Sequence, residues 1–301
     1  MRVLGRIILV VLAVVGSFTL LIAGLGVWTA VKERPDPLPK QMVLMLDLNS
    51  GIVESGSDSP FAKLEMNNAY VLKDVVQALD KASRDPRVAA VVARFDGGHL
   101  GMAKAQELRD AVLAFRKSGK RAVLFSSSMG ESSAATVGYY TASAFQEIWL
   151  QPSGDVGLTG FMAESPFFRE ALDFIGVKPE FGARYEYKSA IETFTSKQFS
   201  NEARQSLEKL LGAWTAQVVN GIAEARGLKP EQVQALIDRS PLLAQEARDG
   251  GLVDRLAYWD EAEKSLTDGG AKLVDIADYA ARSPEEPGTL KVALIYGVGA
   301  V

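Results

Sequence analysis

The chain of 301 residues contains no cysteine and a single histidine, His99. The absence of cysteine excludes disulfide bonds and thiolate metal sites, and a single histidine excludes a histidine-rich metal site. No calcium-binding loop of the D-x-D-x-D-G type is present either. We therefore expect no metal and no other cofactor, and the imidazole and thiol groups that usually act as bases near neutral pH are almost absent.

An excess of positive charge is also missing, because 33 Lys and Arg residues stand against 37 Asp and Glu residues, a net charge of -4. Without a broad basic surface, nucleic acid is not an expected partner. Apolar residues make up 48% of the chain, which is enough for a packed core. The length allows one large domain or two small ones.

One long apolar run without charge lies near the N-terminus, from Ile7 to Val31, and Arg2 and Arg6 precede it. A run of this length reaches the roughly 20 residues that span a bilayer and exceeds the roughly 7–15 residues of a cleavable signal core. We predict a cytoplasmic tail at residues 1–6, a transmembrane signal anchor at 7–31 and a proline-rich linker at 32–41. The protein is then expected to be a single-pass protein of the inner (cytoplasmic) membrane. The lipid bilayer would be a partner, and the bulk of the chain would lie on the extracytoplasmic side.

Strand and helix patterns alternate through the next part of the chain. The expected strands are Met42–Leu48, Val88–Phe95, Arg121–Ser126, Glu147–Leu150, Lys178–Ala183 and a short one after Gly250–Gly251. The expected helices are Asn68–Arg84, Met102–Lys117, Glu131–Ser143, Pro166–Ile175, Asn201–Arg226, Pro230–Asp238, Leu242–Arg248 and Asp260–Leu266. Apolar strands that alternate with helices predict an α/β fold with a parallel sheet.

The end of the chain has a pattern of its own. Ser283–Gly288 is a linker by composition, and Leu290–Tyr296 has the pattern of another buried strand. The segment Val292–Val301 resembles the first strand region, Val43–Val53. One prediction is that residues 289–301 begin a second, truncated repeat. The alternative is that this strand adds to the existing sheet, since a strand cannot satisfy its own backbone groups.

A lysine stands out in the stretch Gly182–Phe194, which is G-A-R-Y-E-Y-K-S-A-I-E-T-F. Lys188 lies there between Tyr187 and Ser189, after a short extended run. Because imidazole and thiol groups are almost absent, a lysine whose pKa is lowered by burial is a leading candidate base. The alternative is an ordinary solvated charge at the end of a strand.

Several motifs together resemble the amino-terminal half of the long, two-repeat form of the S49 (protease IV, signal peptide peptidase A) family of serine peptidases. They are D-P-R-V-A-A-V-V at 85–92, F-R-K-S-G-K at 115–120, G-Y-Y at 138–140, I-W-L-Q-P at 148–152, G-x-T-G at 157–160 and Y-K-S-A at 187–190. The last motif is the most specific, and the resemblance covers nearly the whole chain. It implies a crotonase/Clp-protease-like β/α superhelix for residues 42–288, with Lys188 as the general base of a Ser–Lys dyad.

The nucleophile is the point at which the chain departs from that family. The family's A-A-S-G-G-Y stretch matches Ala134–Tyr139, where Thr136 replaces the serine and Val137 replaces a glycine. Threonine can act as a nucleophile, but its methyl group adds bulk, and loss of the glycine hinders close backbone approach. In the long form the amino-terminal repeat supplies the lysine and the carboxy-terminal repeat supplies the serine. The resemblance therefore implies that this chain lacks its nucleophile and is inactive alone.

Three other groups are candidates for the site. Gly97 and Gly98 fall where the family's second repeat has an S-P-G-G turn that offers N–H groups to an oxyanion, although they can also form an ordinary turn. The serines at 126–128 and 132–133 are either nucleophile candidates or a polar loop that caps the next helix. His99 has no recognisable aspartate partner for a triad.

The function implied by the resemblance is a membrane-anchored serine endopeptidase that degrades cleaved signal peptides or other hydrophobic peptides. Family members assemble into rings or domes, so a homo-oligomer is implied as well. One alternative is a catalytically incomplete repeat that serves as an assembly or scaffold domain. Another is an acyl-thioester binder, which fold analogy alone suggests.

Overall fold

The computed structural model describes residues 15–22, 37–56, 69–97, 100–130, 135–283 and 292–297. The chain divides into two compact units, Met1–Leu38 and Pro39–Val301. In the first unit, residues 15–22 are helical, and Thr19 Oγ1 donates a hydrogen bond to the Val15 carbonyl at 2.8 Å. Most of the anchor predicted at 7–31 lies outside the described residues. Within the described ranges, no helix is both long enough and apolar enough to cross a membrane.

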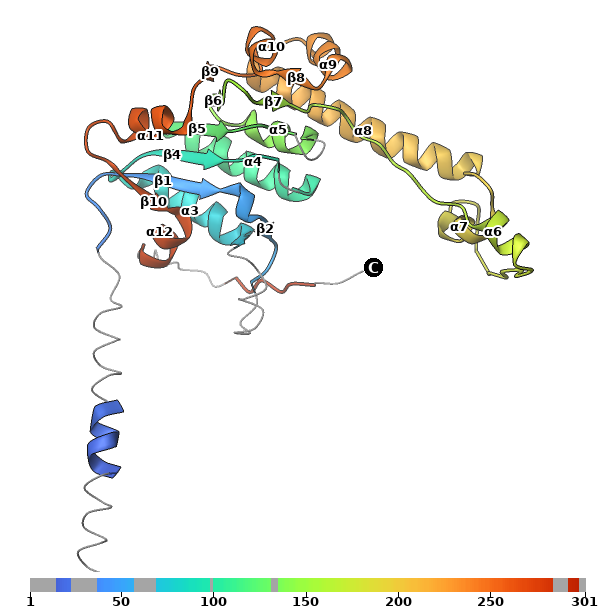
Figure 1. Cartoon of the computed structure of the whole chain (residues 1–301), viewed down its shortest axis with the longest axis horizontal. Coiled ribbons are helices and arrows are strands. Elements are labelled where there is room, and N and C mark those ends of the chain that lie inside the picture. Colours follow the sequence, from blue (N-terminus) through green and yellow to red (C-terminus); the bar gives the residue numbers. More distant parts are fainter. Residues whose placement is uncertain are drawn as a thin grey trace, which may run out of the picture. The chain divides into compact units, whose positions relative to one another are not determined.

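The second unit is built on a six-stranded sheet with the order β10-β1-β4-β5-β6-β9, in which every neighbouring pair is parallel (Figure 1). Its strands are β1 (Met42–Asp47), β4 (Val88–Arg94), β5 (Arg121–Ser126), β6 (Glu147–Leu150), β9 (Arg255–Leu256) and β10 (Lys272–Asp275). Val43 and Leu44 point to opposite faces, and both are fully buried. Burial on both faces explains the continuous apolar runs. The predicted α/β fold with a parallel sheet is confirmed, and the superhelix stays a prediction.

Helices cover both faces of the sheet. On one face, α11 (Trp259–Thr267) packs through Ala262 and Leu266 against a cluster that includes Val43, Val123 and Phe125. The helices of the other layer are α3 (Leu72–Arg84), α4 (Met102–Arg116), α5 (Thr136–Ala142) and α12 (Ile276–Arg282). There α3 contacts α4 and α12, and α4 contacts α5. The apolar residues of α3 recur every three or four positions, which gives the helix one buried face.

The long helix α8 (Asn201–Arg226) has the bounds that the sequence predicts. Ser200 Oγ accepts a hydrogen bond from the Ala203 N–H at 3.1 Å and caps its start. Gly227 ends it with a φ of +66°, a conformation that favours glycine. Most of its buried residues lie in the second half, which packs on α5 and on α9 (Pro230–Arg239). The first half runs out toward α6 and α7 (Figure 1).

The remaining elements are short. They are η1 (Leu48–Ser50), β2 (Ile52–Val53), β3 (Tyr70–Val71), β7 (Asp155–Val156), α6 (Arg169–Phe174), η2 (Ser189–Ile191), α7 (Glu192–Thr195), β8 (Leu242–Leu243) and α10 (Ala244–Asp249). β2 pairs with β3 in parallel, and β7 pairs with β8 in antiparallel orientation.

Some predicted elements differ from the structure. Residues 178–183 form no strand and are mostly exposed, so the strand predicted there is wrong. Residues 292–297 form no strand either, and Val292 and Ile295 are each 90% exposed. An isolated apolar run becomes a strand only where another strand satisfies its backbone groups. The helix expected from Asn68 begins at Leu72, because the two residues before it form β3, whereas β10 and α12 have no counterpart among the predicted elements.

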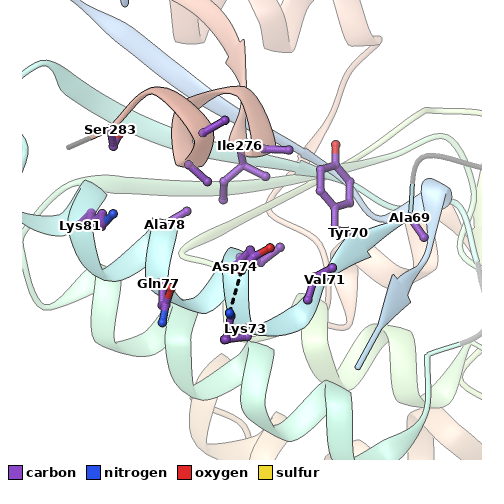
Figure 2. A pocket seen from close by; sticks show the side chains of 14 residues that line it. Ala69, Tyr70, Val71, Lys73, Asp74, Gln77, Ala78, Lys81, Ile276 and Ser283 are labelled. Atoms are coloured by element: carbon purple, nitrogen blue, oxygen red, sulfur yellow. Dashed lines mark ion pairs between the residues drawn. The ribbon is translucent and has the colours of Figure 1, made fainter. Parts of the chain in front are cut away.

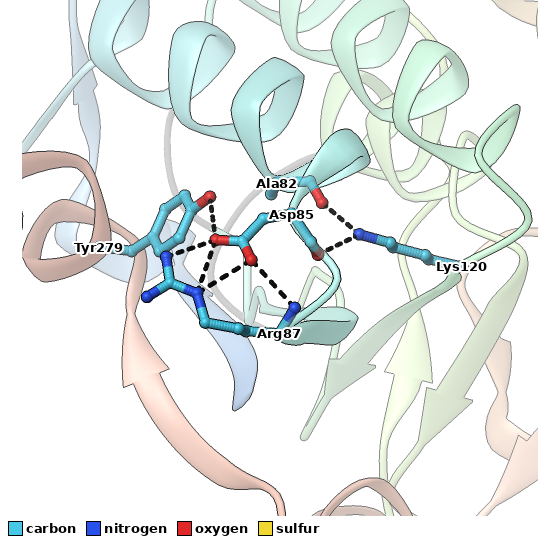
Figure 3. Close-up of polar contacts among 5 residues, drawn as sticks. All are labelled: Ala82, Asp85, Arg87, Lys120 and Tyr279. Atoms are coloured by element: carbon cyan, nitrogen blue, oxygen red, sulfur yellow. Dashed lines mark hydrogen bonds and ion pairs between the residues drawn. The ribbon is translucent and has the colours of Figure 1, made fainter. Parts of the chain in front are cut away.

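One polar cluster ties α12 to the end of α3 (Figure 3). The carboxylate of Asp85 accepts hydrogen bonds from the Arg87 side chain, the shortest at 2.7 Å, and from the Tyr279 hydroxyl at 3.2 Å. Lys120 Nζ donates to the carbonyls of Ala82 and Asp85, each at 2.6 Å. Ala82 lies in the last turn of α3, where a carbonyl lacks a partner within the helix, and the bond from Lys120 satisfies it.

Candidate functional site

Lys188 lies immediately before η2, which continues directly into α7. Residues 177–188 form no helix or strand, and the Lys188 N–H lies 3.4 Å from the Tyr185 carbonyl. Tyr185 has a φ of +66°. A positive φ is rare for so large a side chain, and such outliers cluster at functional sites. The turn at Tyr185 places Lys188 on the surface of the described chain, where it is exposed.

Several contacts attach this segment to the first half of α8. The Tyr187 hydroxyl donates to Gln205 Oε1 at 2.9 Å. The Glu192 carboxylate accepts from Ser200, at 3.0 Å from its N–H and 2.6 Å from its hydroxyl. We call residues 161–210 the arm; it contains α6, η2, α7 and the beginning of α8.

The arm exposes an unusual number of large apolar side chains. The rings of Phe168 and Phe181 both stack on Phe194, at centroid distances of 6.0 and 5.7 Å. Phe174 and Tyr185 are 91% and 75% exposed. The exposed apolar and aromatic residues of the arm are Met162, Phe168, Phe174, Ile175, Val177, Phe181, Tyr185, Tyr187, Phe194 and Leu210. Apolar patches rimmed by polar residues mark interaction surfaces in soluble domains.

A small hollow of about 250 Å³ lies beside Lys188. Ser189 and Ala190, which follow Lys188 directly, line it together with Phe167 and Leu207. The volume is below the roughly 300–1,000 Å³ of pockets for drug-sized ligands. The hollow therefore has room for one side chain of a peptide rather than for a whole cofactor.

The exposure of Lys188 differs from the buried environment expected for a neutral lysine. The described part of the chain leaves the Lys188 side chain exposed, so any burial of this group would have to come from another protein surface. The exposed apolar surface around it is of the kind that a second protein surface covers.

Thr136, at the position matched to the family's nucleophile, is buried and fully hydrogen-bonded. It is 2% exposed at the start of α5. Its hydroxyl donates to the Gly160 carbonyl at 3.0 Å and accepts from the Gly160 N–H at 2.8 Å. The hydroxyl thus links α5 to the segment that leads into the arm, and it is not free to attack a substrate.

A polar cluster at the carboxyl ends of the strands was not recognised from the sequence. The Asp96 carboxylate accepts from the Ser127 N–H at 2.6 Å and from Asn49 Nδ2 at 3.0 Å. The Asp96 N–H donates to Asn49 Oδ1 at 2.7 Å. Gly97 follows with a φ of +105°, which glycine adopts readily. Gly98 and His99 lie outside the described residues. Of the predicted oxyanion turn at Gly97 and Gly98, the structure therefore describes Gly97.

The serines at the end of β5 and just after it have structural partners. Ser126 is fully buried, with its hydroxyl 3.5 Å from Asp96 Oδ1. The Ser128 hydroxyl donates to the Asp155 carboxylate and lies 3.4 Å from the Asp155 N–H. No lysine or histidine is among these partners. Ser132 and Ser133 lie outside the described residues.

A larger hollow, of about 540 Å³, lies between α3 and α12 (Figure 2). Alanines such as Ala78 form its floor, and Lys73 and Asp74 form an ion pair at its edge with a distance of 3.6 Å. The Tyr70 hydroxyl donates to Asp275 at 2.6 Å, and burial raises the pKa of this tyrosine. In the part of the chain that the structure describes, no three His, Cys, Asp or Glu side chains gather to hold a metal ion.

Comparisons with known proteins agree with the motifs. The model of peptidase family S49 matches residues 114–273. "Serine protease SPPA, chloroplastic" of Arabidopsis thaliana is 29% identical over 206 residues, covering 68% of this chain and 30% of that protein. "Protease 4" of Haemophilus influenzae is 26% identical over 298 residues, covering 89% of this chain and 47% of that protein. The chain thus spans less than half the length of either relative.

The solved structures that are similar to the chain include one at low identity. It is DspI of Pseudomonas aeruginosa, at 14% identity over 84% of this chain and 79% of that one, with a TM-score of 0.31.

Proposed function

Because the chain belongs to peptidase family S49, we propose that it is part of a serine-type endopeptidase in which Lys188 is the general base. The observation that supports this role most directly is the setting of the Y-K-S-A lysine. It stands on a turn with a strained Tyr185, beside a hollow and within an exposed apolar surface. A second protein surface packed on the arm would bury Lys188 and complete the site.

In the proposed reaction, neutral Lys188 Nζ removes the proton from a serine hydroxyl. The serine oxygen bonds to the scissile carbonyl carbon, and backbone N–H groups stabilise the resulting oxyanion. The C–N bond then breaks, and the protonated lysine returns its proton to the leaving amine. Water, deprotonated by the same lysine, attacks the acyl-enzyme and releases the second product with the serine restored.

We propose that the serine comes from outside the described residues, either from a further repeat or from another chain. Thr136 is unsuitable because both sides of its hydroxyl are occupied by Gly160. The hydroxyls of Ser126 and Ser128 bond to aspartates rather than to a base.

The same proposal includes a membrane anchor, a class of substrate and an assembly of copies of the chain. The uncharged run at residues 7–31 would anchor the protein in the inner membrane, with residues 42–288 on the extracytoplasmic side. The substrates would be cleaved signal peptides or other hydrophobic peptides, which suit an apolar surface around the base. Copies of the chain would assemble through the exposed apolar side chains of the arm.

The test is replacement of Lys188 in the full-length protein in its membranes. We expect Lys188→Ala to lower turnover of a hydrophobic peptide by about 10²–10⁴-fold, the usual contribution of a general base. Lys178→Ala is the matched control, because Lys178 is an exposed lysine of the same arm. Turnover that survives in Lys188→Ala, at the same protein level, would remove Lys188 from the mechanism.

A non-catalytic scaffold is the second candidate, and the occupied hydroxyl of Thr136 favours it. A repeat without a nucleophile could serve only to assemble partners. A fluorophosphonate probe applied to the native assembly separates the two functions. Labelling that is lost in Lys188→Ala supports the peptidase, whereas no labelling in any assembly supports the scaffold.

A further inference from the structure

A buried arginine lies where the arm joins the α/β layers. Arg109, in α4, is only 6% exposed. Its Nη1 donates to the Tyr140 carbonyl at 2.8 Å and to Ser143 Oγ at 2.7 Å, and its Nη2 donates to the Gly221 carbonyl at 2.7 Å. One side chain of α4 therefore bonds both the end of α5 and the interior of α8.

All these acceptors are neutral, and within the described residues Arg109 forms no ion pair with a carboxylate. Burial lowers the pKa of Arg109, but a guanidinium stays charged at neutral pH. A buried cation is costly when any of its N–H groups loses its partner. A shift of α8 that moved the Gly221 carbonyl away would incur this cost, so Arg109 restricts the orientation of α8.

Close packing restricts α8 further at the same place. The Arg109 guanidinium carbon lies 4.6 Å from the centroid of the Tyr140 ring. The same ring contacts Gly221 so closely that a Cβ atom at that position would lie 2.5 Å from Tyr140 Cε2. Because residue 221 is a glycine, α8 approaches α5 closely enough for the Gly221 carbonyl to accept the hydrogen bond from Arg109.

α8 connects this joint to Lys188. Gln205, which holds Tyr187, lies about 24 Å from Gly221 along the helix at roughly 1.5 Å per residue. A tilt of α8 by about 5° would displace Lys188 by about 2 Å, and a misplacement of about 1 Å can already lower a rate about 100-fold.

We propose that Arg109 is a positioning residue that fixes the orientation of the arm and thereby places Lys188. The catalytic consequence rests on the proposed function, in which Lys188 is the base. The orientation of the arm can be measured without any activity, so the two claims can fail separately.

The chain has no cysteine, so two spin labels can be placed at introduced cysteines without background. We would label Gln77→Cys on α3 and Lys178→Cys on the arm, both exposed sites, in the full chain diluted with unlabelled protein. Electron–electron double resonance then gives the distribution of distances between α3 and the arm. Arg116→Met is the matched control, because Arg116 donates from α4 to the Ala144 carbonyl at 2.7 Å but does not bond α8.

We expect the distance distribution to be broader or shifted in Arg109→Met and unchanged in Arg116→Met. An unchanged distribution in Arg109→Met would overturn the proposal. If that variant does not fold, Arg109→Lys replaces it, since one ammonium cannot reproduce the fork that bonds two helices. The same result is then expected, and an unchanged distribution again overturns the proposal.

Turnover supplies the second measurement. We expect Arg109→Lys to lower kcat at least about 10-fold with little change in KM, because the base is misplaced rather than the substrate lost. Arg116→Met should keep both values. An altered distance distribution with an unchanged kcat would refute the positioning role, whereas turnover that survives in Lys188→Ala would refute the proposed function instead.

Discussion

The carboxylate of Asp85 shows how a single residue joins segments that are far apart in the sequence. Its side chain is 12% exposed, and it accepts hydrogen bonds from Arg87 and from Tyr279 of α12. The Arg87 side chain is the main cause that lowers the pKa of Asp85 from 3.8 to about 2. The ionised form is therefore stabilised more in the folded protein than in the unfolded chain.

This difference predicts how the stability of the fold depends on pH. The contribution of Asp85 is fully present above the unfolded pKa of 3.8, falls as the pH drops toward the folded pKa of about 2, and is lost below it. We expect Asp85→Asn to lower the free energy of unfolding by about 1–2 kcal/mol at neutral pH and to flatten its pH dependence over that range. Chemical denaturation of the full chain at several pH values measures both effects.

The control for Asp85 is an aspartate within α3 that is also paired with arginine but is exposed. Asp80 bonds Arg84 at 2.8 Å one helical turn away, with 63% of the Asp80 side chain exposed. We expect Asp80→Asn to cost only about 0.3–0.5 kcal/mol. Equal losses in the two variants would contradict the role given to the buried cluster.

Sequence motifs single out Lys188 and Thr136 but do not describe their surroundings. The motif Y-K-S-A identifies Lys188 as a candidate base. It does not determine whether the side chain is exposed, because that depends on which surfaces pack on the arm. The hydroxyl of Thr136 is occupied by Gly160, 24 residues away. Asp96 and Asn49 meet only because β1 and β4 are neighbours in the sheet. Such partners are set by topology, which no local pattern contains.

At the scale of the elements, strong local signals give correct predictions. α8 begins at its Ser200 cap and ends at Gly227, since both signals act within one turn of the helix. β10 and α12 lack such signals, because β10 becomes a strand only by pairing with β1 from the other end of the chain. The apolar run at 292–297 shows the opposite case: it suits a strand but has no strand partner among the described residues. The segment 178–183 contains Lys178, Pro179 and Glu180, and it also forms no strand.

We expect substitution by alanine to have opposite effects on stability at the two glycines inside α8. A Cβ atom at Gly221 would lie 2.5 Å from the Tyr140 ring, so we expect Gly221→Ala to destabilise the protein by about 1–3 kcal/mol. Gly212 has no heavy atom within 4 Å of its ideal Cβ position. Gly212→Ala should therefore stabilise the helix by about 0.5–1 kcal/mol.

Thermal unfolding of the two variants side by side measures this difference. The spin-label distance between α3 and the arm should change only in Gly221→Ala, because only that residue lies in the joint with α5. Destabilisation by both substitutions, or by neither, would show that α8 is not held by this close approach.

At the scale of the whole molecule, the proposed assembly accounts for both the exposed apolar surface of the arm and the exposure of Lys188. The arm displays aromatic side chains to solvent, and Lys188 lies among them. Each apolar side chain left in water forgoes about 1.5–3 kcal/mol of burial. Assembly of copies through the arm would recover this energy and would give Lys188 the buried setting that a neutral base needs.

Phe174 is the residue that tests assembly with least effect on the fold, because it is 91% exposed. We expect Phe174→Glu to weaken association at least about 10-fold, since a carboxylate would have to be desolvated in the interface. Leu243→Glu is the control, because Leu243 is 67% exposed and lies on β8 outside the arm. Light scattering on the full chain in detergent should show a smaller particle for Phe174→Glu only. A mass that changes in Leu243→Glu instead would place the interface away from the arm. The burial of Lys188 would then need a partner other than a second copy.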